Sequence, residues 1–77
     1  MVKNKLIQFE NDIATLHCLP QNKENDSFDI RVDVVQKKLL QNTLGYKNAY
    51  VVHAMYKIFE IFEETHSVPN EAVSMWY

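Results

Sequence analysis

Residues 46–65 form the segment that most constrains what this chain can fold into. The segment contains no glycine or proline, and Ser67 and Pro69 follow it, so it predicts one long C-terminal helix. Its apolar side spans about 200°, whereas an ordinary surface helix buries an apolar stripe of about 100°. One face of a small sheet cannot easily cover so wide a surface. The apolar residues are Tyr50, Val51, Val52, Ala54, Met55, Ile58, Phe59, Ile61 and Phe62.

This apolar surface has two interpretations. The helix is either the central, fully packed helix of its own fold, or its second side is an interface. The second interpretation draws on the enrichment of Tyr, Phe, Met and Trp at interfaces. It predicts interface residues at Tyr46, Tyr50, Met55, Phe59, Phe62 and Trp76.

The shortness of the chain favours self-association. A domain below about 70–80 residues rarely gains more than about 3–5 kcal/mol from its core, and this chain has 77 residues. Cys18 is the only cysteine, so no intramolecular disulfide can stabilise the fold. The sequence therefore predicts a homodimer that uses the second side of helix 46–65, together with Trp76.

The N-terminal part predicts a β-hairpin. Two segments of strand character, 4–10 and 13–19, flank Asn11 and Asp12, which tolerate the positive φ of a tight turn. Pro20 closes the second strand, and polar residues 21–27 form a loop.

Residues 28–34 alternate apolar and polar side chains, which favours a half-buried third strand. A helix capped by Asp26 is the alternative, because Phe28, Val32, Val35 and Leu39 also fall at helical spacing.

Two short helices complete the predicted fold. Residues 36–42 are good helix formers, and this helix would end near Gly45, the only glycine. Residues 68–76 place apolar side chains at helical spacing and predict a short terminal helix. The predicted class is α+β, in one domain over 1–77, with an antiparallel sheet of two or three strands against one long helix and one or two short ones.

No set of residues carries a catalytic, cofactor or metal signature. His17 and Cys18 are adjacent and point to opposite faces of a strand. His53 and His66 lie nearly four helical turns apart, so a metal site would need tertiary or intersubunit contacts. We expect a buried structural cysteine, a solvated stripe of carboxylates at Glu60 and Glu64, and no cofactor.

The charge distribution argues against nucleic-acid binding. The net charge is −2, and the acidic excess lies in residues 45–77, whereas nucleic-acid binders normally cluster basic residues. The alternative is a helix-turn-helix made of residues 34–42, a turn at 43–46 and the long helix, with Lys37, Lys38 and Lys47 facing phosphates.

The function predicted from the sequence is that of a small, non-enzymatic protein-binding module, homodimeric and cytoplasmic. No apolar run approaches the roughly 20 residues of a membrane span. Abundant Asn and Lys suit an AT-rich bacterium or its phage. The sharpest version of the hypothesis is therefore a phage- or mobile-element-encoded inhibitor or anti-defence factor that blocks a host protein. A small nucleic-acid-binding transcriptional regulator is the alternative.

Overall fold

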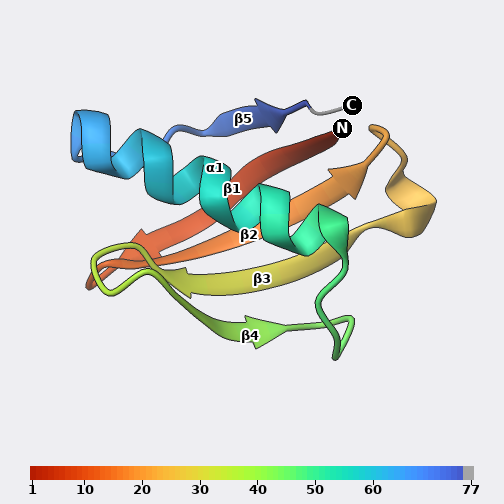
Figure 1. The fold of residues 1–77 in the computed structure, drawn as a ribbon, viewed down its shortest axis with the longest axis horizontal. Helices are drawn as coiled ribbons and strands as arrows, with labels where there is room; N and C mark the ends of the chain where they lie inside the picture. The colour runs from red at the N-terminus through yellow and green to blue at the C-terminus, as the bar shows by residue number, and fades with distance from the viewer. Residues whose placement is uncertain (76–77) are drawn as a thin grey trace.

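Five antiparallel strands and one helix make up the fold, which a computed structural model describes for residues 1–75 (Figure 1). The strand order in the sheet is β4-β3-β2-β1-β5. The α+β class and the long helix are confirmed, but the sheet has more strands than the two or three predicted, and strands β4 and β5 stand where the two short helices were predicted. The elements are β1 (Val2–Glu10), β2 (Ile13–Pro20), η1 (Glu24–Asp26), β3 (Phe28–Asp33), β4 (Lys38–Asn42), α1 (Ala49–Thr65) and β5 (Glu71–Ser74).

The N-terminal hairpin has the predicted strands and turn. Asn11 and Asp12 lie between β1 and β2 with φ of 54° and 66°, the left-handed region that such a turn needs. The strands extend slightly past the predicted limits, since Val2 pairs with Pro20. Residues 28–33 form strand β3, in agreement with the favoured interpretation, and its Ile30 and Val32 side chains are fully buried.

The predicted helix at 36–42 is wrong, because the chain turns sharply and forms β4. The Asp33 carboxylate accepts hydrogen bonds from the backbone N–H groups of Val35 (3.0 Å) and Gln36 (2.9 Å), and Lys37 has φ of 57°. This turn returns the chain along β3, where Leu39 packs against the core. Because residues 38–42 form a strand, the first helix of the alternative helix-turn-helix, predicted over 34–42, is also wrong.

The predicted helix at 68–76 is likewise wrong where the structure describes it, because Glu71–Ser74 forms strand β5 beside β1. His66 ends α1 in the left-handed conformation (φ 57°), and its N–H donates to the Phe62 carbonyl at 2.7 Å. The chain then reverses and adds a strand to the open edge of β1, with Ala72 packed against the core. Trp76 lies outside the described residues.

Helix α1 begins at Ala49 rather than at 46, because Asn48 caps it. The Asn48 side chain accepts a hydrogen bond from the Val51 N–H at 2.9 Å, which satisfies one of the free donors of the first turn. Asn48, a polar residue within the apolar segment 46–65, is therefore the start signal of the helix.

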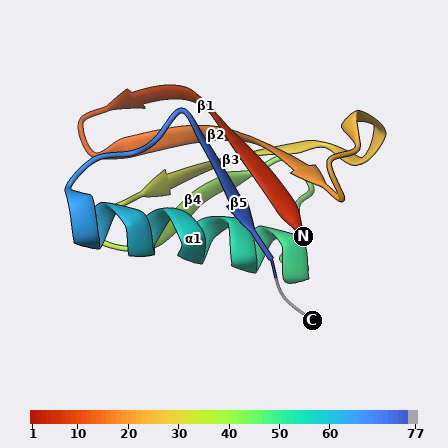
Figure 2. The same cartoon turned by 90° about the horizontal axis from the view of Figure 1, so that it is seen from above.

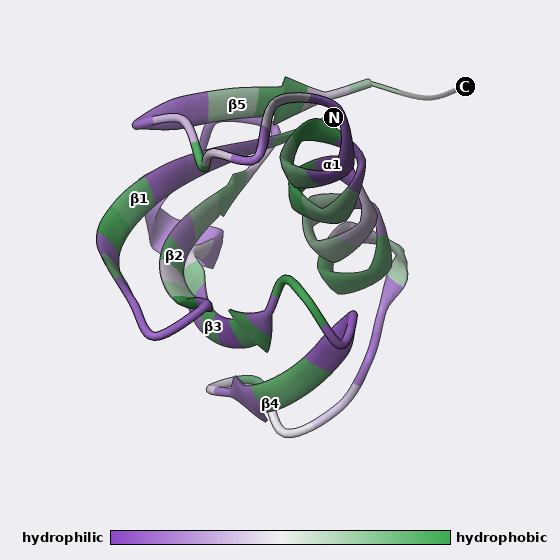
Figure 3. Ribbon diagram, turned by 90° about the vertical axis from the view of Figure 1, so that its left-hand side faces the viewer, coloured by the Kyte–Doolittle hydropathy of each residue, from purple (hydrophilic) through white to green (hydrophobic). Residues whose placement is uncertain are grey.

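The core lies between α1 and the curled sheet (Figures 2 and 3). Strand β5 and the start of β1 lie along one flank of the helix. Near the C-terminal end of the helix, the rings of Phe9 and Phe62 make an edge-to-face contact with 6.1 Å between their centroids. The chain itself thus covers much of the wide apolar surface of α1. The helix residues that are buried are Val51, Ala54, Met55, Ile58 and Phe59. Among residues 1–75, no helix has the length and apolar character needed to cross a membrane.

Candidate functional site

The residues predicted to form an interface separate into two groups. Met55 and Phe59 are buried in the core, and Phe62 is half-buried against it. Tyr46 is 61% exposed, and Tyr50 is half-buried. The structure brings Tyr46 and Tyr50 to one surface hollow, and this pair is the part of the prediction that can meet another molecule directly.

The hollow lies where the β2–β3 connection faces the start of α1, and we refer to it as the tyrosine groove. Its volume is about 530 Å³. One wall is segment 20–28 and the other is segment 44–50. The lining residues are Pro20, Gln21, Lys23, Asn25, Asp26, Ser27, Phe28, Leu44, Tyr46, Asn48 and Tyr50.

The first wall owes its shape to a turn directly after β2. Gln21 and Asn22 adopt positive φ values of 52° and 57°, a conformation that Asn tolerates well. The N–H of Asn22 donates to the Leu19 carbonyl (3.1 Å), and the N–H of Lys23 donates to the Pro20 carbonyl (2.9 Å). These bonds fold the polar loop over the end of the sheet.

The second wall is fixed by Asn42 at the end of β4. Its side-chain oxygen accepts from the Leu44 N–H (3.1 Å), and its amide donates to the Tyr46 carbonyl (2.7 Å). Gly45 between them has φ of 78°, which glycine adopts without strain. The backbone beneath the Tyr46 side chain is therefore held in place. Across the groove, the Gln21 amide donates to the Tyr50 hydroxyl at 3.4 Å.

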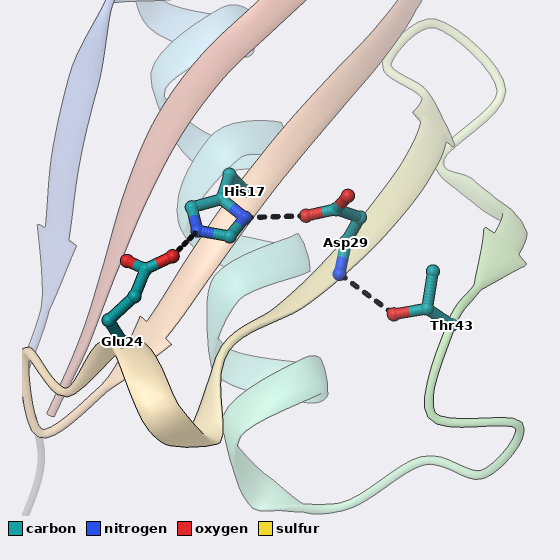
Figure 4. A network of polar contacts seen from close by, with 4 residues as sticks. All are labelled: His17, Glu24, Asp29 and Thr43. Carbon is teal, nitrogen blue, oxygen red and sulfur yellow. Dashed lines mark hydrogen bonds and ion pairs between the residues drawn. The ribbon is translucent and has the colours of Figure 1, made fainter.

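A polar network on the outer face of the sheet braces both walls (Figure 4). His17 Nδ1 lies 2.6 Å from Asp29 Oδ1, and His17 Nε2 lies 3.0 Å from Glu24 Oε1. The backbone N–H of Asp29 in turn donates to Thr43 Oγ1 at 2.9 Å. The network thereby connects η1 in one wall, through β2 and β3, to the segment that leads into the other wall.

The network sets the protonation of His17. The hydrogen bond to Asp29, followed by the interactions with Glu24, outweighs partial burial and raises the pKa of His17 above its usual value of 6.5. Sequence reasoning considered His17 only as a metal ligand. The alternation of 28–34 placed Asp29 on the outer face, but the pairing of His17 with Asp29 depends on the register of β2 and β3.

We expect the stabilisation from this network to fade as the pH rises. Because the folded-state pKa of His17 is raised, its contribution is complete below the unfolded value of about 6.5 and is lost as pH rises through the folded value. His17→Gln should therefore lower the free energy of unfolding by up to about 1 kcal/mol at pH 5.5, and by less at pH 8.5.

Urea titrations at the two pH values measure this difference. Glu24→Gln keeps the histidine and removes one of its two carboxylate partners. It should therefore lower the free energy of unfolding less than His17→Gln does, and again more at pH 5.5 than at pH 8.5. An effect of His17→Gln that is the same at both pH values would show that the ring is not held as an imidazolium.

Cys18 is placed as an inert core residue. It lies on the opposite face of β2 from His17 and has no solvent exposure. Burial raises the pKa of its thiol to about 12, so the thiolate needed for nucleophilic or metal chemistry is scarce at neutral pH. Among the described residues, no group of three or more His, Cys, Asp or Glu side chains could hold a metal ion.

The groove therefore offers an apolar floor at Phe28 and Leu44, two tyrosine rings, and amide and charged groups at its rim. This combination suits the binding of side chains and backbone from another protein. Comparison with known proteins found no match to a family model, to a curated protein or to a solved structure.

Proposed function

We propose that this chain is a small, non-enzymatic protein-binding module that holds a segment of its partner in the tyrosine groove. The observation that carries the proposal is Tyr46, a large aromatic side chain that is 61% exposed at a hollow whose two walls are braced by hydrogen bonds. Tyrosine provides a large contact area at a low cost in side-chain entropy. A fixed backbone also reduces the ordering cost of binding.

The composition of the groove favours a protein over other ligands. Its rim carries the opposite charges of Lys23 and Asp26 rather than a cluster of one sign, so it offers no concentrated field for a polyanion. The hollow has the volume of a few side chains and is open at the surface. These features support recognition of a short protein segment with one or two apolar anchors.

The proposal includes three points from the sequence. The sharpest form of the function is inhibition of a host protein by a factor encoded on a phage or mobile element. The proposed location is the cytoplasm, in keeping with a single free cysteine. Self-association is also part of the proposed function.

The experiment that tests the function is capture with matched variants. Immobilised wild-type protein, Tyr46→Ala, Lys23→Glu and Tyr56→Ala are exposed to a bacterial lysate, and the captured proteins are identified. Tyr56 is also 61% exposed but lies outside the groove, so Tyr56→Ala is the control. We expect a protein that wild type and Tyr56→Ala retain, and that the two groove variants lose.

Two results would contradict the proposal. One is a set of captured proteins that all four baits share equally. The other is the retention of nucleic acid that salt between 50 and 200 mM removes, which would favour the regulator alternative.

A further inference from the structure

We propose that the free edge of β4 pairs in antiparallel orientation with the β4 edge of a second copy of this chain, so that two sheets join into one. The inference rests on the self-association in the proposed function. It specifies where the copies meet, which is at the sheet edge rather than on the second side of the helix.

Strand β4 is an exposed edge that carries one exposed apolar side chain, Leu40. It ends the sheet order, and a bulge in its pairing with β3 leaves Leu40 without a partner in the register. Lysines and bulges normally protect such edges from pairing. Strand β4 has both devices, with Lys38 at its start and the bulge at its centre, but the bulged residue is Leu40, whose side chain is apolar and 51% exposed.

A shallow hollow of about 400 Å³ follows this edge and is lined by residues 39–42 and 45–47. An added strand gains main-chain hydrogen bonds from the edge and side-chain contacts from such a hollow. The opposite edge, β5, is shorter and lies beside α1. Of the two edges, β4 is therefore the more open to an added strand.

The sequence of β4 is compatible with a two-fold axis at Leu40. Antiparallel pairing centred there places Leu40 opposite the second copy's Leu40, and Lys38 opposite the second copy's Asn42. No like charges meet in this register, and the exposed leucines cover each other. A symmetric interface requires this self-complementarity.

Charge complementarity also favours a second copy as the occupant. Glu60, Glu63 and Glu64 rim a hollow of about 460 Å³ near the end of α1, and the last turn of the helix contains no basic residue. Carboxylates at a helix C-terminus are unfavourable because they meet the negative end of its dipole. Within the chain, Lys37 contacts Glu63 at 2.7 Å and lowers the pKa of that carboxyl.

The proposed pairing would bring positive charge to this acidic hollow. Strand β4 runs opposite to α1, so its Lys38 end lies near the helix C-terminus and its Asn42 end near the helix N-terminus (Figure 1). A two-fold axis at Leu40 therefore brings the second copy's Lys47, which follows its β4, toward the acidic end of this α1. By the same symmetry, Lys47 of this copy approaches the acidic end of the second copy's α1.

The interface would be small, because β4 has only five residues. Interfaces below about 1,200 Å² are typical of weak complexes, so we expect a dimer that forms and dissociates with concentration in the micromolar range. A weak dimer leaves the tyrosine groove accessible to another protein.

Light scattering over a concentration series tests the inference. The molar mass should rise from 9.1 kDa toward twice that value for wild type and for Val73→Lys. It should stay at the monomer value for Leu40→Lys, because two lysines would oppose each other at the axis. Val73 is the matched control, an exposed apolar residue (42%) on the other edge strand, and circular dichroism verifies that both variants fold.

Cysteine cross-linking tests the register. With oxidised glutathione as the oxidant, Leu40→Cys should form an interchain disulfide across the axis, where paired Cα atoms lie about 4.5–5.5 Å apart. Val73→Cys should not, and native Cys18 is buried. If wild type dimerises, Leu40→Lys also dimerises and Leu40→Cys forms no cross-link, the pairing of the two β4 edges is overturned but self-association is not. A monomer at every concentration would overturn both, and capture through the groove would still be tested separately.

Discussion

Replacement of Phe59 by alanine is expected to lower the free energy of unfolding by about 3–5 kcal/mol. Phe59 is 3% exposed and belongs to the core cluster between α1 and the sheet. A chain of this size gains only about 3–5 kcal/mol in total from such a core. The variant should therefore be largely unfolded at 37 °C, and any loss of partner binding would follow from unfolding.

Urea denaturation followed by far-UV circular dichroism measures this effect. The control is Tyr56→Ala, which removes a neighbouring aromatic ring that contacts Phe59 edge-to-face at 6.1 Å but is 61% exposed. Its cost should stay below about 1 kcal/mol. A Phe59→Ala variant that keeps wild-type stability would place Phe59 on the surface, as the interface interpretation of the sequence required.

A carboxylate at position 4 should be nearly as damaging. Asn4 is 1% exposed, and its side-chain amide donates to the Ala54 carbonyl of α1 at 3.1 Å. Its side-chain oxygen has no hydrogen-bond partner among the described residues. Asn4→Asp replaces the only donor with a buried, unpaired charge beside a carbonyl oxygen. We expect a loss of about 3 kcal/mol or more at pH 7.

The pH dependence of this variant identifies the cause. A buried aspartate has a folded-state pKa above its unfolded value of about 3.9, so stability should be highest below that value and fall as the pH rises to 7. Asn4→Leu, of similar size and without charge, should stay within about 1 kcal/mol of wild type. A loss for Asn4→Asp that does not change between pH 4 and pH 7 would contradict the burial of this side chain.

The elements that were predictable from the sequence are those with strong local signals. The β1–β2 hairpin follows from two apolar segments around Asn11 and Asp12, and α1 follows from the long apolar pattern of 46–65. Strands β4 and β5 were mistaken for helices because 36–42 and 68–76 have helical composition or spacing. Their conformation is decided by the open edges of β3 and β1, with which they pair. The edge of β1 is distant from β5 in the sequence, whereas β4 follows β3 after a turn at 34–37 that the composition of 36–42 does not indicate.

The candidate site was predictable only in part, for the same reason. Tyr46 and Tyr50 were identified because tyrosine is enriched at interfaces, but their opposite wall comes from residues 20–28, which the fold brings to them. The apolar pattern of α1 did not distinguish Phe59, buried by the sheet, from Tyr46, exposed before the helix. That distinction required the position of the sheet and the cap at Asn48.

The groove and the β4 edge share Tyr46, but Lys23 lines only the groove and Leu40 lines only the hollow along β4. Leu40→Lys should give a monomer that still captures the partner, because Leu40 does not line the groove. Lys23→Glu should give a protein that still dimerises but loses the partner, because Lys23 lines the groove and not the hollow along β4. These two variants therefore distinguish a failure of the proposed function from a failure of the proposed dimer.

The affinity of the captured protein is the measurement that tests the central claim most directly. Isothermal titration against wild type, Tyr46→Ala and Tyr56→Ala gives three dissociation constants. An anchor residue at an interface contributes about 2 kcal/mol or more, so Tyr46→Ala should weaken binding about 30-fold or more, while Tyr56→Ala changes it less than about threefold. Equal dissociation constants for all three proteins would contradict binding through the tyrosine groove.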